Sequence, residues 1–293
     1  MNPYLFLPIL FVLSALPIAI LYRVSHNLKK KRFPFSDRIP RPAGHSVGKK
    51  TDEFVFDLMS LLFLCVFLAF MAMFFLFSEN LIIRVTGIFL VLIELFTVVK
   101  AYKLATKLFN YNLGYAGELA VGQNLNQLML DGYHVYHDFV FHEIFNIDHV
   151  IVGKNGVFAI ETKARTKPND IDKKKYNVTY DGKALYFEDK PDYAQTDFLE
   201  QSKKGAKFLS KELSSSTGEA VKVFSVLVLP GWYVNYKTNQ TNAEVKVFNH
   251  NILDSIKSLK TSSDLSDRQQ KQIIHQLKQK CCDLDLNRGR WGE

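Results

Sequence analysis

Two carboxylates and a lysine lie on two neighbouring apolar runs of the sequence. Asp148 stands at the start of the first run, and Glu161 and Lys163 stand at the end of the second. The runs are separated by Asn155-Gly156, a pair that predicts a β-hairpin because a type I′ turn needs positive φ at both central residues. The sequence therefore predicts two paired strands that carry polar side chains at one end.

The register of this hairpin decides whether the polar side chains meet. A two-residue turn pairs Asp148 with Lys163, and a four-residue loop pairs Asp148 with Glu161. Both registers put all three side chains on one face of the sheet, because directly opposed residues and residues two apart share a face. A slip of one residue would separate them.

Polar side chains on a sheet face that should be core have two explanations. The first is a partly buried ion pair at the end of the sheet. The second is a Mg²⁺ (or Mn²⁺) site, because that ion prefers hard oxygen ligands and Lys163 could orient the attacking water or stabilise charge on a phosphate.

Glu118 and Gln201 are further candidates for this site. Glu118 extends an apolar helical stripe formed by Val121, Leu125 and Leu128, where a carboxylate is costly without a partner. Its other possible role is a favourable interaction with the helix dipole. Gln201 stands near the start of a helix and could orient water, base or phosphate, or simply be exposed.

The elements that must position these side chains form an α/β domain over residues 114–293. Apolar periodicity predicts helices and strands that assemble as a mixed sheet flanked by helices. The expected helices are 115–130, 197–213 and two near the C-terminus, and the expected strands are 133–141, 148–153, 157–164, 221–229 and 245–248.

Three apolar runs precede this domain, over residues 3–22, 54–77 and 81–99, and each is long enough to cross a bilayer. Basic residues follow the first run, an order that argues against a cleaved signal peptide. The expected organisation is a transmembrane helix (1–22), a basic cytoplasmic loop (23–53), a transmembrane hairpin (54–99), a basic juxtamembrane linker (100–113) and the α/β domain (114–293).

The basic residues also predict topology. Residues 23–53 hold nine Lys or Arg and three Asp or Glu, which places this loop in the cytoplasm, the N-terminus outside and the C-terminal domain inside, as in a bacterial inner membrane. Arg84 and Glu94 are either boundary residues or a polar contact between helices. The small number of charges within the runs favours an anchor over a transporter.

Nucleic acid would need a local basic patch, because the domain from residue 114 onward has a net charge of only +1. Such a patch follows the second strand of the hairpin, although a solvated lysine loop would look the same. The candidate phosphate contacts are Arg165, Lys167, Lys173, Lys174 and Lys175.

The combined motifs resemble the nuclease-related domain (NERD) family of the PD-(D/E)xK nuclease superfamily. The resemblance spans about residues 113–277 and rests on Gly114 to Glu118, Asn146 to Gly153, Gly156 to Lys163, and Gln201. Ile147 departs from the superfamily's Pro. The resemblance implies a restriction-endonuclease-like core in which Asp148 and Glu161 bind Mg²⁺. It also implies that Lys163 acts in catalysis, Glu118 supports a second metal or a water, and Gln201 completes the site.

The sequence therefore predicts a membrane-anchored, metal-dependent nuclease that hydrolyses DNA on the cytoplasmic side. Two other functions remain open. One is a non-catalytic nucleic-acid-binding or sensing module with a nuclease-like fold. The other is a structural membrane protein that recruits partners and uses the polar residues as an ion-pair network.

Overall fold

The computed structural model describes residues 39–141, 145–167, 176–237, 243–259 and 264–282, together with Ile20 and Arg23. The predicted first transmembrane helix, apart from Ile20, and residues 24–38 of the basic loop that follows it lie outside the described residues. Residues 1–40 and 282–293 form one unit, in which Pro40 pairs with Cys282. Residues 41–281 form the second unit, which contains all the elements below.

Two long helices open this second unit. They are α2 (His45–Leu76) and α3 (Leu81–Leu125), and each is long and apolar enough to cross a membrane. Only 11% of the most apolar window of each helix is buried, whereas a core helix of a soluble protein is mostly buried. Large side chains such as Phe63 and Phe96 are 71% exposed. The two helices therefore fit a membrane anchor.

The bend between α2 and α3 is short, as the sequence predicted. Asn80 caps α3 by accepting a hydrogen bond from the Ile82 amide at 2.9 Å. The Arg84 guanidinium donates to the Ser78 carbonyl at 3.1 Å. Arg84 therefore contacts the end of the hairpin, as expected of a boundary residue.

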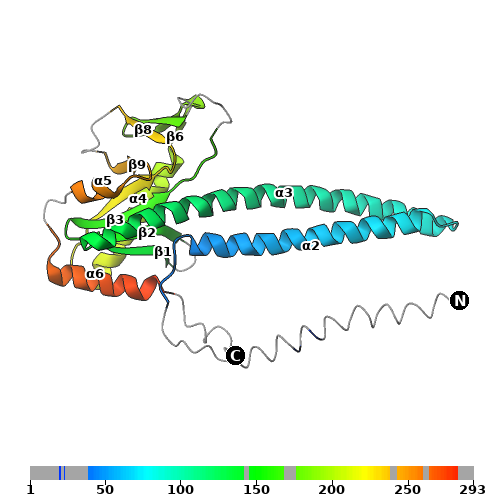
Figure 1. The fold of residues 1–293 in the computed structure, drawn as a ribbon, viewed down its shortest axis with the longest axis horizontal. Helices are drawn as coiled ribbons and strands as arrows, with labels where there is room; N and C mark the ends of the chain where they lie inside the picture. Colours follow the sequence, from blue (N-terminus) through cyan, green and yellow to red (C-terminus); the bar gives the residue numbers. More distant parts are fainter. Residues whose placement is uncertain are drawn as a thin grey trace. The chain divides into compact units, whose positions relative to one another are not determined.

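Helix α3 continues from the apolar hairpin into the α/β domain without a break (Figure 1). Residues 100–113, predicted as a basic juxtamembrane linker, are helical and lie within α3, and they contain no Gly or Pro that would interrupt the helix. The apolar part of α3 ends near Val99, and Val121 and Leu125 are fully buried in the domain. One helix thus joins the anchor to the core.

A mixed five-stranded sheet forms the centre of the domain in the order β1-β2-β3-β7-β9. The first three strands are antiparallel, and β7 and β9 run parallel to β3. These elements and the short helix before them are η2 (Asn126–Asp131), β1 (His134–Phe141), β2 (Phe145–Gly153), β3 (Gly156–Thr162), β7 (Val223–Val228) and β9 (Val245–Phe248).

The β2–β3 hairpin adopts the predicted register that places Asp148 opposite Glu161, but its turn has two residues instead of four. Gly153 pairs with Gly156, and Val152 pairs with Val157, so Lys154 and Asn155 form the turn. The type I′ turn over Asn155-Gly156 was therefore wrong. Gly156 has φ 140, and the Asn155 side chain donates to the Ile256 and Leu259 carbonyls instead.

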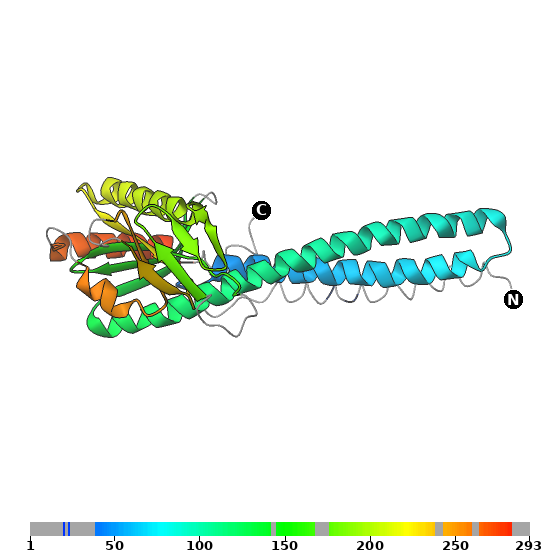
Figure 2. The ribbon, with the colours of Figure 1, turned by 90° about the horizontal axis from the view of Figure 1, so that it is seen from above.

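Helices cover both faces of this sheet (Figure 2). On one face, α4 (Asp197–Thr217) and α6 (Asp267–Lys280) pack through Leu209 and Leu277. On the other face, the end of α3 and α5 (Leu253–Ser258) pack through Leu125 and Ile256. The α/β fold predicted from the sequence, a mixed sheet flanked by helices, is thereby confirmed.

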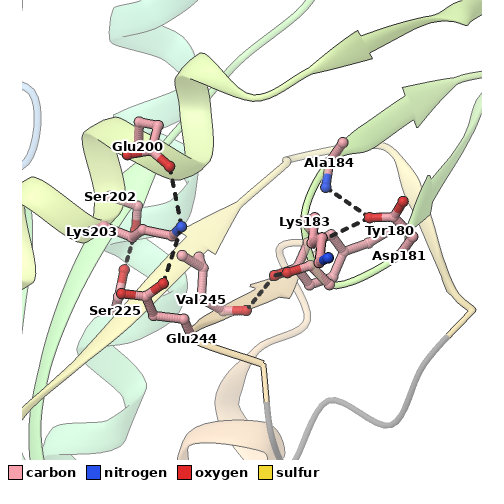
Figure 3. Close-up of polar contacts among 11 residues, drawn as sticks. Tyr180, Asp181, Lys183, Ala184, Glu200, Ser202, Lys203, Ser225, Glu244 and Val245 are labelled. Carbon is pink, nitrogen blue, oxygen red and sulfur yellow. Dashed lines mark hydrogen bonds and ion pairs between the residues drawn. The ribbon is translucent and has the colours of Figure 1, made fainter.

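Three strands in the polar stretch after β3 join β8, which follows β7, in a second sheet that the sequence analysis missed. Its order is β6-β5-β4-β8, and its strands are β4 (Asn177–Tyr180), β5 (Leu185–Phe187), β6 (Lys190–Gln195) and β8 (Tyr233–Tyr236). The Tyr180 hydroxyl donates to the Val245 carbonyl at 3.0 Å, and the Ser202 hydroxyl lies 2.9 Å from that of Ser225 (Figure 3). These contacts hold α4 and the second sheet against the central sheet.

The segment that leads into α2 packs against the α/β domain. The Ser46 hydroxyl donates to Asp138 Oδ2 at 2.7 Å, and Arg41 Nη1 donates to the Asp138 carbonyl at 2.5 Å. Asp138 has φ 53, an uncommon value for a residue with a side chain but one that Asp tolerates. Residues 41–50 were expected to be a cytoplasmic loop, whereas they form part of the domain surface.

Gly122 permits the close approach of this segment to α3. A Cβ at Gly122 would lie 2.4 Å from the Ala43 Cβ. Gly122→Ala should therefore destabilise the domain by about 1–3 kcal/mol through overpacking. Gly114→Ala is the matched control, because it lies in the same helix with nothing within 4 Å of the added Cβ. The control should be neutral or stabilise by up to about 1 kcal/mol.

Thermal unfolding of the full-length chain in detergent measures both changes. Equal unfolding temperatures for the two variants would contradict the close packing of Ala43 on Gly122.

Candidate functional site

All five residues singled out as catalytic line one pocket of about 330 Å³: Glu118, Asp148, Glu161, Lys163 and Gln201. They come from four different elements or their ends. The pocket lies where β3 ends and where α3 and α4, from opposite faces of the sheet, both pass. The structure thus brings together residues that are far apart in the sequence.

Asp148 and Glu161 face each other across β2 and β3. The register that pairs His149 with Ile160 puts Asp148 opposite Glu161 one position further along. Asp148 is 7% exposed and Glu161 is 4% exposed. The Thr162 amide donates to Asp148 Oδ2 at 2.7 Å, and Lys163 Nζ lies 2.7 Å from Glu161 Oε1. The structure therefore contains an ion pair between Lys163 and Glu161, which was the first of the two explanations for the polar residues in the sequence.

Helix α3 brings the third carboxylate to the end of β3. A Cβ at Gly117 would lie only 2.6 Å from the Ala164 Cβ, so the absence of a side chain lets the helix pass close to the strand end. Glu118 follows directly and is 7% exposed. The apolar stripe that the sequence predicted is correct, and Glu118 continues it into the pocket.

The three carboxylates shift one another's protonation. Burial, followed by repulsion from Asp138 and Glu161, raises the pKa of Glu118 to about 7. Burial and repulsion from Glu161 and Glu118 raise the pKa of Asp148 well above its usual value. Burial also raises the pKa of Glu161, although the Lys163 ammonium opposes the shift. One lysine does not balance three buried carboxylates.

A divalent cation fits the chemistry of this pocket. The available ligands are hard carboxylate oxygens, and a positive ion would relieve the repulsion that raises their pKa values. The buried Asn146 Oδ1, which belongs to a pocket residue, has no hydrogen-bond partner among the described residues. In the conformation described, however, no group of three His, Cys, Asp or Glu side chains in the described ranges is close enough to hold a metal.

In this conformation, two of the carboxylates are already held by other groups of the protein. Thr162 holds one Asp148 oxygen, and Lys163 holds one Glu161 oxygen. Metal binding would require the carboxylates to turn toward a common point. Asp148 and Glu161, with Glu118 as the third, are the residues that would hold the ion.

A buried histidine pair supports the strand that carries Asp148. The Nδ1 atoms of His137 and His149 lie 2.9 Å apart, and His137 Nε2 lies 3.0 Å from Asn126 Oδ1. Burial lowers the pKa of both histidines, that of His137 to about 4. His149 contacts His137 and Thr162, so the pair is a neutral packing element.

Sequence reasoning missed several residues that line the pocket. Asn146 sits two residues before Asp148 on the same strand face, and this spacing could have identified it. Thr162 is the residue between Glu161 and Lys163 on β3. No local pattern could have identified the others, because their place depends on where α2 and α3 pack. These other pocket residues are Ser46, Val47, Lys50 and Tyr111.

Arg165, a predicted phosphate contact, makes internal interactions. Its guanidinium lies 2.5 Å from Asp189 Oδ2 and 4.2 Å from the centre of the Phe187 ring. Its carbonyl accepts a hydrogen bond from Trp232 Nε1 at 3.4 Å. Arg165 therefore joins the end of β3 to the second sheet. Lys167 is exposed, with Nζ 4.4 Å from the Tyr176 ring centre, and Lys173, Lys174 and Lys175 lie outside the described residues.

Comparison with protein families supports the resemblance noted in the sequence. The family model described as the nuclease-related domain matches residues 113–230. The matched part of the chain runs from the end of α3 to just past β7, and it contains all five site residues. No curated protein and no solved structure matches the chain.

Glu118→Gln tests the electrostatic strain in the pocket. The pKa of Glu118 is about 7 in the fold against a reference of 4.5, so ionised Glu118 destabilises the metal-free protein. Below pH 4.5, Glu118 is protonated in both the folded and the unfolded chain and costs no folding free energy. As the pH rises from 4.5 through 7, its ionisation lowers the free energy of unfolding. The variant should therefore exceed the wild type by on the order of 2–3 kcal/mol at pH 8, with little difference at pH 4.5.

The measurement is thermal unfolding of the full-length chain in chelator across this pH range. Glu219→Gln, at an exposed position, is the control and should follow the wild type. A pH-independent difference between Glu118→Gln and the wild type would contradict the shifted pKa.

Arg165 and Lys167 should differ in how much each contributes to the stability of the domain. Arg165→Ala should destabilise the domain by about 1–3 kcal/mol, because it removes a half-buried ion pair and a cation–π contact. Lys167→Ala should change stability by less than about 0.5 kcal/mol, as is usual at an exposed site. Denaturant unfolding measures both, and equal values would show that Arg165 is not a structural link.

Proposed function

We propose that this protein is a membrane-anchored, metal-dependent nuclease that hydrolyses phosphodiester bonds of DNA on the cytoplasmic side. The observation that carries the proposal is the convergence of Glu118, Asp148, Glu161, Lys163 and Gln201 on one pocket of a nuclease-related domain. An ordinary ion-pair network does not require three buried carboxylates around one lysine, because such an excess of charge is costly.

The chemistry follows from these side chains. Mg²⁺ or Mn²⁺, when bound, would supply Lewis-acid activation of water and of the phosphate. Asp148 and Glu161 would hold the ion, and the Thr162 amide orients Asp148 by donating to its Oδ2. Lys163, 24% exposed at its side chain, faces the pocket and stabilises negative charge that develops on the phosphate.

The remaining two residues act on water and substrate. Glu118, with a pKa of about 7, changes protonation near neutral pH and supports a water or a second ion. Gln201 is exposed at the pocket and offers an amide that can orient water or phosphate. The pocket thus combines buried carboxylates with an exposed amide, that of Gln201.

The membrane assignment rests on α2 and α3. Lys100, Lys103 and Lys107 follow the apolar part of α3 and precede the nuclease-related domain. The excess of Lys and Arg on this side favours a cytoplasmic location for the domain, in a bacterial inner membrane. Tethering would restrict cleavage to nucleic acid near the membrane.

Substitution of the carboxylates and the lysine tests the proposal. Asp148→Asn, Glu161→Gln and Lys163→Met should each reduce DNA cleavage by at least about 100-fold, because each removes charge from the reacting centre. Glu219→Gln should cleave at the wild-type rate. The assay uses the full-length chain with duplex DNA, single-stranded DNA and RNA, in Mg²⁺, Mn²⁺ or chelator.

The alternatives predict different results. Cleavage in chelator, or full activity of Glu161→Gln, would contradict the proposed site. Nucleic-acid binding that is indifferent to Mg²⁺ and never leads to cleavage would identify a binding or sensing module. No affinity for nucleic acid even at low salt would identify a structural membrane protein.

A further inference from the structure

We propose that Lys50, on the second turn of α2, contacts a phosphate of the bound nucleic acid. The anchor helix then supplies one wall of the substrate site. This inference rests on the proposed function and adds to it a residue outside the nuclease-related domain match, which begins at residue 113.

The wall is one face of α2. Ser46, Val47 and Lys50 all line the pocket that contains the carboxylates. Lys50 follows Ser46 by four residues and Val47 by three, and both spacings put Lys50 beside these two residues on the helix surface. Lys49, equally exposed, is turned by about 100° around the axis and does not line the pocket.

Several contacts fix the position of this face. Ser46 bonds to Asp138 at 2.7 Å, and the buried Ala43 packs at Gly122. A Cβ at Gly44 or at Gly48 would lie within about 3 Å of the Tyr115 ring, so the first turn of α2 lies directly on α3. Lys50 follows on the next turn, which makes it part of a built site rather than of a free loop.

The charges in the pocket explain why Lys50 is needed. Lys163 is paired with Glu161, and three carboxylates would repel an approaching phosphodiester. Lys50 is exposed and has no ion pair within the described part of the chain. It is the pocket cation that remains available for a phosphate after Lys163 has bound its carboxylate.

A lipid headgroup is the other anion that a lysine beside a membrane span could contact. The apolar run of α2 starts at Phe54, one turn after Lys50. Binding to lipid should involve Lys49 and Lys50 alike, because both are exposed at the same depth. Only Lys50 lines the pocket, and this difference favours the nucleic acid.

The test compares Lys50→Ala with Lys49→Ala in the full-length chain, in nanodiscs of neutral lipid. Binding of a labelled DNA duplex is measured over a series of salt concentrations with Ca²⁺, a cation that also takes oxygen ligands. Lys50→Ala should weaken binding about 3- to 10-fold and reduce the salt slope by about 0.9, the value for one phosphate contact. In the cleavage assay it should raise KM more than it lowers kcat. Lys49→Ala should match the wild type.

Each result decides between the possibilities. Unchanged affinity and slope in Lys50→Ala would overturn the inference while leaving cleavage by the wild type, and so the proposed function, intact. Equal losses in both variants would assign the effect to general charge or lipid. If the wild type binds DNA but does not cleave it, the salt slope still tests Lys50. If the wild type binds no DNA at low salt, the inference and the proposed function both fail.

Discussion

The burial of three carboxylates around one lysine at the end of β3 is the constraint on which the site depends. Glu118, Asp148 and Glu161 are each less than 10% exposed, and repulsion among them raises the pKa of Glu118 and Asp148 beyond what burial does alone. The fold keeps this arrangement because the Thr162 amide and Lys163 each bind one carboxylate oxygen. The pocket therefore has more negative than positive charge. A divalent cation between the carboxylates and Lys50 at the substrate would supply the missing positive charge.

The same site joins the two halves of the molecule. Helix α3 is continuous from Leu81 to Leu125, so the element that leaves the apolar hairpin is also the element that carries Glu118. Gly117 and Gly122 let this helix approach the end of β3 on one side and the start of α2 on the other. The apolar hairpin and the pocket are therefore linked, because both helices of the hairpin contribute residues to the pocket. Removing the residues before α3 would take away Ser46, Val47 and Lys50.

Local patterns were sufficient to predict the centre of the fold. Alternation of apolar residues in β2 and β3 put Asp148 and Glu161 on one face whichever register formed, and the helical stripe of α3 pointed to Glu118. The turn itself was misassigned by one residue, because Lys154 and Asn155 form it while the Asn155 side chain bonds to the α5 region. The docking of residues 41–50 and the internal role of Arg165 could not be predicted, since both depend on partners 24 to 97 residues away. The second sheet was missed because its strands are only three to six residues long.

The most direct test of this account is calorimetric titration of Mn²⁺ into the full-length chain at pH 6.5, repeated in buffers of different ionisation enthalpy. Glu118, whose pKa is about 7, is largely protonated at this pH and must release its proton when the site binds a cation. The account predicts specific Mn²⁺ binding with proton release, and loss of both in Asp148→Asn. Absence of binding, or the same binding and proton release in Asp148→Asn, would contradict the assignment of these buried carboxylates as a metal site.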